Sequence, residues 1–281
     1  MRIKSMITGS VLATAISVLA APASAISIDI TITNIAPAGG VYLTPVWVGF
    51  HNGSFDSYDG GTASAPELEA LAEDGDTAPI SGVFGANGTL VATATAQTGT
   101  RVQDTLGGLL APGGTVTQRF QVDLNSANRY LSYASMVLPS SDYYIANGNP
   151  LAHDLLTLLA GGSTSFFIGA PNGGVNDAGT EVNDFATSAG NPLFGIPGGQ
   201  SGPNQGANEN GVNANVVGDP YGGFANQPVG GVASSLDFNS YDNGIARVDI
   251  AVAPVPGSVV LMVSAFAGAG FIARRRMAKQ A

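Results

Sequence analysis

The sequence predicts an all-β fold: an antiparallel β-sandwich with one or two short helices and a long Gly/Asn-rich loop. Three observations lead to this prediction. Apolar and polar residues alternate with a period of two in several short runs, clusters of Gly, Pro and Asn separate the runs, and only one short segment has a clear helical pattern. A chain of 281 residues is also long enough to bury a substantial core.

The first predicted strand starts at Ile26, where four isoleucines at every second position alternate with Ser, Asp and Thr. A period of two is typical of a strand with one buried face. Further strands are predicted from similar runs at 42–50, 89–96, 115–123, 130–138, 163–170 and 245–252.

The clearest helix is predicted to follow Ser64. Ser64 and Glu67 have the spacing of a capping box, Leu68 and Leu71 share one helical face, and Gly75 can end the helix. Residues 151–159 are a weaker helix candidate. Residues 190–231 are rich in Gly and Asn and poor in large apolar residues, so we expect a long loop inserted between late strands.

Composition excludes several classes of protein. The chain has no Cys, which excludes disulfides, zinc-thiolate sites and a cysteine nucleophile. Six of its ten Lys and Arg residues lie in the terminal segments, so a body without them has four Arg against twenty acids, or 4 − 20 = −16. So acidic a body repels nucleic acid and anionic lipid and favours cations or neutral partners such as glycans.

The first 25 residues have the pattern of a secretory signal peptide. Arg2 and Lys4 precede an apolar stretch, and small residues lead up to Ala25, after which cleavage is expected. The alternative is a buried N-terminal helix.

The C-terminal segment, 254–281, predicts a sorting signal. Pro254 and Pro256 precede sixteen uncharged residues, 258–273, and then three arginines. A helix of this length spans about 24 Å, short for a bilayer core but workable with snorkelling arginines, which favour a cytoplasmic end. The segment resembles the PEP-CTERM sorting signals of bacteria in a Val-Pro-x-Pro variant. That resemblance implies an exosortase-type membrane protease as a partner; the alternative is a membrane anchor that is never cut.

Residues for catalysis are few. Only His51 and His153 could exchange protons near neutral pH, and the chain lacks a Gly-x-Ser-x-Gly elbow, a His-Glu-x-x-His pair and a phosphate-binding loop. His153 precedes Asp154, but a loop His beside a solvated Asp is far more common than a catalytic pair. A glycoside hydrolase needs only two carboxylates and stays open, although a single Trp, Trp47, is few for a glycan cleft.

Several segments between residues 26 and 253 resemble, in order, the spondin N-terminal domain of F-spondin and mindin. The most specific are Leu-Ser-Tyr-Ala-Ser-Met-Val-Leu-Pro-Ser-Ser-Asp, which ends at Asp142, and Asp-Ala-Gly-Thr-Glu at 177–181. Weaker ones are Ile-Thr-Ile-Thr-Asn at 30–34, Pro-Val-Trp-Val-Gly-Phe-His at 45–51, and Leu-Glu-Ala-Leu-Ala-Glu-Asp-Gly at 68–75. The resemblance implies a β-sandwich similar to C2 domains, with Ca²⁺ held by loops at one end.

By position, the resemblance places the metal ligands at Asp142, Asp177 and Glu181. The chain departs from animal members in having Glu at 181 and no Cys. Two carboxylates around a Gly-containing turn also suit Ca²⁺, which takes six to eight oxygen ligands. The alternative is that these acids are ordinary solvated loop residues. Trp47 and His51 match a family segment too, but we interpret them as structural.

The sequence therefore predicts an exported protein of the cell envelope, the outer surface or the medium, transiently anchored in the inner membrane. Its expected function is non-enzymatic: calcium-dependent adhesion to exopolysaccharide or to a surface protein ligand, with no nucleic acid partner. The second hypothesis is an extracellular glycan hydrolase that uses paired carboxylates.

Overall fold

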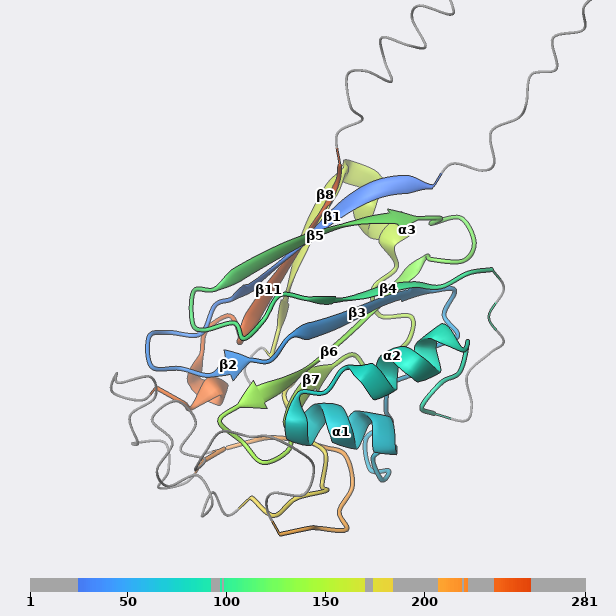
Figure 1. The fold of residues 1–281 in the computed structure, drawn as a ribbon. Helices are drawn as coiled ribbons and strands as arrows, with labels where there is room; N and C mark the ends of the chain where they lie inside the picture. Colours follow the sequence, from blue (N-terminus) through green and yellow to red (C-terminus); the bar gives the residue numbers. More distant parts are fainter. Residues whose placement is uncertain are drawn as a thin grey trace, which may run out of the picture.

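The computed structural model describes residues 25–91, 97, 99–169, 174–183, 207–218, 220–221 and 235–253. Within them, two antiparallel sheets pack face to face, and two helices cover the outer side of one sheet (Figure 1). The predicted all-β sandwich is confirmed. The predicted signal peptide, except Ala25, and the predicted sorting signal at 254–281 lie outside the described residues, and so do residues 92–96 and most of the predicted loop at 190–231.

The first sheet has four strands among the described residues, in the order β5-β1-β11-β8. They are β1 (Ile26–Asn34), β5 (Thr115–Val122), β8 (Ser163–Ile168) and β11 (Ala246–Val252). β1 is a central strand, since its backbone pairs with β5 on one side and with β11 on the other. Its isoleucines face the core between the sheets. The last described strand, β11, therefore lies beside the first, β1.

The second sheet runs β10-β9-β7-β6-β3-β4 in the described residues, with β2 also paired to β6. Its strands are β2 (Tyr42–Leu43), β3 (Val46–His51), β4 (Val102–Leu106), β6 (Tyr130–Leu138), β7 (Tyr143–Ala146), β9 (Asn176–Asp177) and β10 (Ala214–Asn215). Every residue of β3 is buried, because both faces of this strand are covered.

Helices α1 (Pro66–Asp74) and α2 (Ala78–Gly85) provide that cover (Figure 1). Leu68 and Leu71 of α1 and Phe84 of α2 pack with Trp47 in a cluster separate from the core between the sheets. Trp47 is fully buried, as expected of a structural residue, but it faces the helices. The protein therefore has two apolar layers, one between the two sheets and one between the second sheet and the helices. The short helices α3 (Leu155–Leu158), η1 (Leu159–Gly161) and η4 (Phe238–Ser240) lie in connections.

The observed elements differ from the predicted ones in several places. The strand expected at 42–50 is divided into β2 and β3 around Pro45, where a ring nitrogen has no N–H to donate. Leu90 and Val91, the first apolar residues of the strand expected at 89–96, lie in bends. Strands β4 and β7 and helix α2 were not predicted, since each is too short to show a clear period.

The predicted helix at Ser64 is α1, and Gly75 ends it in a left-handed conformation. Its N-cap, however, is Ala65, without a side-chain cap. The Ser64 hydroxyl instead donates to the backbone oxygen of Ala178 and to the side chain of Asn213. The described residues hold no helix long and apolar enough to cross a membrane.

Candidate metal centre

Asp142 and Asp177 come together at one end of the second sheet. Asp142 immediately precedes β7, and Asp177 ends β9, where it pairs with Tyr143. The register of these two strands therefore places the two aspartates beside each other, although Asp177 lies 35 positions, 177 − 142, after Asp142 in the chain.

Asp142 is completely buried and holds the turn at 177–181. Its Oδ2 accepts hydrogen bonds from the backbone nitrogens of Thr180, at 2.8 Å, and Glu181, at 3.1 Å, and from the Thr180 hydroxyl at 3.3 Å. A carboxylate that accepts backbone N–H groups is a strong local organiser, because charge-assisted hydrogen bonds are about twice as strong as neutral ones.

The turn itself requires glycine at position 179. Gly179 has φ 67°, and a Cβ there would lie 2.5 Å from the backbone nitrogen of Val212. The backbone of Gly179 accepts from Gly211 at 2.7 Å, and that of Thr180 accepts from Glu209 at 2.7 Å. Through these bonds, residues 207–218 of the predicted Gly/Asn-rich loop form a wall of this site. The same residues include strand β10.

The electrostatics of the site are unfavourable to ionised Asp142. Burial, and secondly the charge of Asp177, raise the pKa of Asp142 to about 7, although its hydrogen bonds to the turn act in the opposite direction. Among the described residues, no Lys or Arg forms an ion pair with Asp142 or Asp177. A bound cation would relieve this repulsion.

Two buried oxygens at the site have no hydrogen-bond partner among the described residues: Oδ1 of Asp142 and Oδ1 of Asn183. The Asn183 amide donates to Oδ2 of Asp177, while the backbone nitrogen of Gly179 donates to Oδ1 of Asp177 at 2.7 Å. Carboxylate and amide oxygens are the ligands that Ca²⁺ takes in proteins. Asp142, Asp177 and Asn183 therefore carry oxygens of the chemical types that a hard cation takes.

Glu181 ends the turn at 177–181 and is buried. Its backbone nitrogen is bonded to Asp142, but its charge acts on Asp74, at the end of α1. The pKa of Asp74 is raised to about 6 by burial first and then by Glu181 and Asp76. No three His, Cys, Asp or Glu side chains of the described chain form a group that could hold a metal ion.

Sequence reasoning missed Asn183 and Asp74 at this end of the molecule. The helix offered one signal for Asp74: Glu73 and Asp74 stand in the last turn of α1, where the macrodipole disfavours anions and where no basic residue is present. Nothing in the sequence distinguished Asn183 from the many other Asn residues around it.

The two histidines lie elsewhere and are buried. His51 Nε2 lies 2.9 Å from the Ser132 hydroxyl, and its Nδ1 accepts from the backbone of Gly53, so the ring is neutral. Burial lowers the pKa of His51 to about 3 and that of His153 to about 4. His153 stacks on Phe166, while Asp154 pairs with Arg129 and caps α3. His153 and Asp154 are therefore engaged with different partners.

A scan of protein-family models finds none that matches this chain, and no curated protein matches it.

Proposed function

We propose that this protein is an exported, non-enzymatic adhesion module of the spondin type that binds Ca²⁺ at Asp142, Asp177 and Asn183. The observation that carries the proposal is the buried, unpartnered Oδ1 of Asp142 beside a second carboxylate. Glu181 contributes its backbone nitrogen, which fixes Asp142. Bound Ca²⁺ would supply the positive charge that neutralises the pair, and the chain's own residues hold the turn around it.

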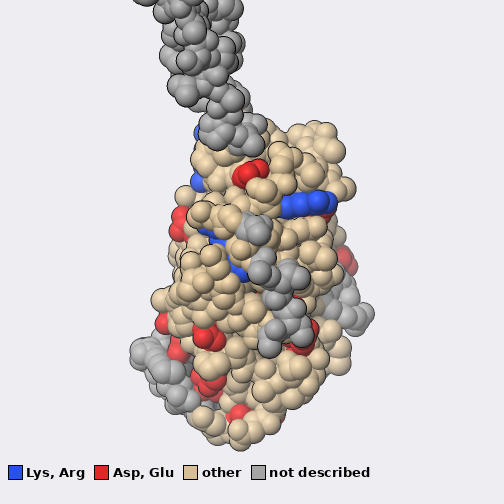
Figure 2. Space-filling view, turned by 90° about the vertical axis from the view of Figure 1, so that its right-hand side faces the viewer, with Lys and Arg blue, Asp and Glu red and all other residues tan. Residues whose placement is uncertain are grey.

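Adhesion is favoured over glycan hydrolysis at this pair by the burial of Asp142. A hydrolase needs two carboxylates that flank the glycosidic bond, and Asp142 has no exposed surface. The proposed ligand is exopolysaccharide or a surface protein, which the acidic body meets outside the cell. Figure 2 shows one side of this body: Lys and Arg atoms lie in its upper half, and acidic atoms are spread over both halves.

The test is a pull-down of the full-length protein on exopolysaccharide of its own source organism, with Ca²⁺ and with a chelator. We expect retention with Ca²⁺, weaker retention with chelator, and no shorter chains in the supernatant. Release of shortened glycan would establish the hydrolase instead, and equal retention in both conditions would separate adhesion from the metal.

Export and sorting complete the proposal. We expect the mature chain to begin at Ile26, and we expect truncation after Ala253 to release the body into the medium, because the tail at 254–281 would hold it in the membrane until an exosortase-type protease cuts it. N-terminal sequencing and cell fractionation check both points. An intact Met1 on exported material, or identical fractionation of the truncated and full chains, contradicts them.

A further inference from the structure

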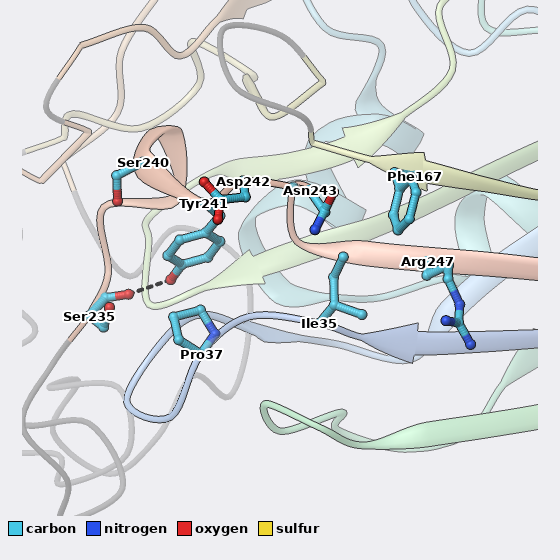
Figure 3. Close-up of a pocket in the computed structure, with 10 residues that line it drawn as sticks. Ile35, Pro37, Phe167, Ser235, Ser240, Tyr241, Asp242, Asn243 and Arg247 are labelled. Carbon is cyan, nitrogen blue, oxygen red and sulfur yellow. Dashed lines mark hydrogen bonds between the residues drawn. The ribbon is translucent and has the colours of Figure 1, made fainter.

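A cavity of about 590 Å³ opens at one end of the first sheet, and neither Asp142 nor Asp177 lines it (Figure 3). It is lined by Phe167 of β8, Arg247 of β11, Ile35 and the turn that carries Tyr241, Asp242 and Asn243. Its volume lies within the range of about 300–1,000 Å³ that is usual for small-molecule sites. Size alone therefore allows a ligand.

Phe167 is unusual among the aromatic residues. It is about half exposed, and every other Phe, Tyr or Trp of the described residues is more deeply buried. The alternation of β8 turns Ser163, Ser165 and Phe167 outward, and the strand register places Phe167 directly opposite Arg247. An aromatic ring thus stands on an otherwise polar face with a guanidinium beside it.

The opposite wall of the cavity is fixed in place. The Tyr241 hydroxyl donates to the backbone oxygen of Ser235 (Figure 3) and accepts from the backbone nitrogen of Val41 at 3.3 Å. The Ser240 hydroxyl donates to the Asp237 backbone at 2.7 Å. These bonds hold the turn that carries Asp242 and Asn243, which line the cavity. A ligand that binds there would therefore not have to order this loop first, which lowers the entropic cost of binding.

A second cavity, of about 380 Å³, lies on the same outer face. It is lined by Asp29, Thr31, Asp249 and the run Ser163–Ser165. The ion pair between Arg247 and Asp249, with 2.8 Å between Nε and Oδ2, connects the two cavities along β11. At about 3.3 Å per residue the seven residues of β11 extend over about 23 Å, which is long enough for a chain-like ligand.

The two halves of this face differ in how their side chains are used. On the β1–β5 half, outward residues bond to one another: Thr31 to Thr117 at 2.8 Å, and Asp29 to Arg119 through two contacts of 2.7 Å. On the β8 half, the outward hydroxyls of Ser163 and Ser165 make no side-chain hydrogen bond with the described residues. Both cavities are lined by residues of β8 and β11, and the smaller one also reaches Asp29 and Thr31 of β1.

The chemistry of the face indicates a neutral ligand. Asp29 and Asp249 are each paired with an arginine, so the charges largely cancel, and the acidic body repels anionic polymers. Exposed hydroxyl, amide and guanidinium groups can bond to ligand hydroxyls, and an exposed ring can cover the apolar face of a pyranose. An uncharged polysaccharide offers both features along one chain.

We propose that the outer surface of β8 and β11, together with the turn that carries Asn243, binds a neutral, pyranose-based polysaccharide. Phe167 would stack on one sugar ring. This inference rests on the adhesion function proposed above and assigns its glycan contact to a surface separate from Asp142 and Asp177. Arg247 and Asn243 would bond to the hydroxyls of the ring that Phe167 covers.

The test is calorimetric titration of the full-length protein with hexasaccharides of β-1,4-linked glucose, of β-1,4-linked mannose and of alginate. We expect at least one neutral hexasaccharide to bind, and the acidic alginate to bind more weakly. Phe167→Ala should lower that affinity about five- to tenfold, since one ring contact is lost. Leu109→Ala, which removes a similarly exposed apolar side chain that lines neither cavity, should leave it unchanged.

The outcomes separate this site from the adhesion function. If the wild type binds a neutral glycan but Phe167→Ala and Arg247→Ala bind it equally well, this site is wrong and adhesion stands. If alginate binds most tightly, the neutral ligand is wrong. If no hexasaccharide binds, both the site and the polysaccharide part of the proposed function fail. Unchanged melting temperatures of the variants show that any loss is local.

Discussion

The outer face of the first sheet and the end of the second sheet beside β9 both carry aspartates, but only the outer face supplies them with cations. Asp29 is paired with Arg119, and this hydrogen-bonded partner keeps the pKa of Asp29 below its usual value. Asp142 is buried beside Asp177, and its pKa is raised. An aspartate is thus stabilised as an ordinary surface ion in the first place, whereas in the second it is buried beside another carboxylate without a cationic partner.

That difference matters because a buried charge is costly unless it is paired. A structural role alone would be met by a neutral acceptor at 142, since only Oδ2 holds the turn. The second oxygen, Oδ1, has no hydrogen-bond partner and so adds nothing to the hydrogen bonding of the turn. Uncompensated buried acids of this kind are candidate functional groups.

The largest effect is expected from Asp142→Ala, which removes the acceptor of the Thr180 and Glu181 backbone nitrogens. Each buried donor left without a partner costs about 1–3 kcal/mol, so with two such donors the free energy of unfolding should fall by roughly 2–6 kcal/mol. Urea denaturation measures it. Asp142→Asn keeps an acceptor and is the matched control; if both variants lose the same stability, the hydrogen bonds to the turn are not what matters.

Ca²⁺ should stabilise the wild type by about 2.7 kcal/mol at a hundredfold excess over its dissociation constant. For a domain of this size the melting temperature should rise by about 5–10 °C. Asp177→Asn should remove most of this gain and leave the melting temperature without Ca²⁺ unchanged or slightly higher, because a repulsive charge is lost. Thermal melts with Ca²⁺ and with a chelator check it, and an equal shift in both proteins would show that these acids bind no metal.

The pH dependence without Ca²⁺ should distinguish wild type from Asp142→Asn. The folded-state pKa of Asp142, about 7, lies above the ordinary value of 3.8, so its protonation favours the folded state. This contribution is complete below pH 4 and is lost as the pH rises to 7, by at most about 1.4 kcal/mol per pH unit.

The buried histidines act in the opposite direction, because their lowered pKa values make unfolding take up protons below pH 6.5. Only the difference between the wild type and Asp142→Asn therefore isolates the aspartate. Chemical denaturation at several pH values gives that difference, and parallel curves would mean that Asp142 is ionised in the folded protein throughout.

The smallest effect is expected on the outer face. Arg119→Ala removes an exposed ion pair, and such pairs contribute little to stability. Its melting temperature should stay within experimental error of the wild type, and salt should not change that result. A large loss would show that the outer face depends on its charges as strongly as the site at Asp142 does.

Strands with one buried face were predictable from the sequence, because burial imposes a period of two on their residues. β1 and β5 are such strands and agree with the predicted bounds to within a residue. β6 also has the predicted bounds, although all its residues except the first are buried. Helix α1 was predictable from its own start and stop signals. β7 and α2 were not, since their burial comes from neighbours: α2 packs against Trp47, and β7 lies between β6 and β9.

For the site, a family resemblance in the sequence indicated Asp142, Asp177 and Glu181 as candidates. The sequence by itself determined that Gly179 is free to take a left-handed turn and that catalytic groups are scarce. Only the tertiary structure decided that the two aspartates meet, that Glu181 acts on Asp74, and that Asn183 has an unpartnered oxygen. Strand period and turn preference are local properties of the chain. The proximity of charges and the burial of an oxygen depend on which strands become neighbours, and that is settled by the packing of segments far apart in sequence.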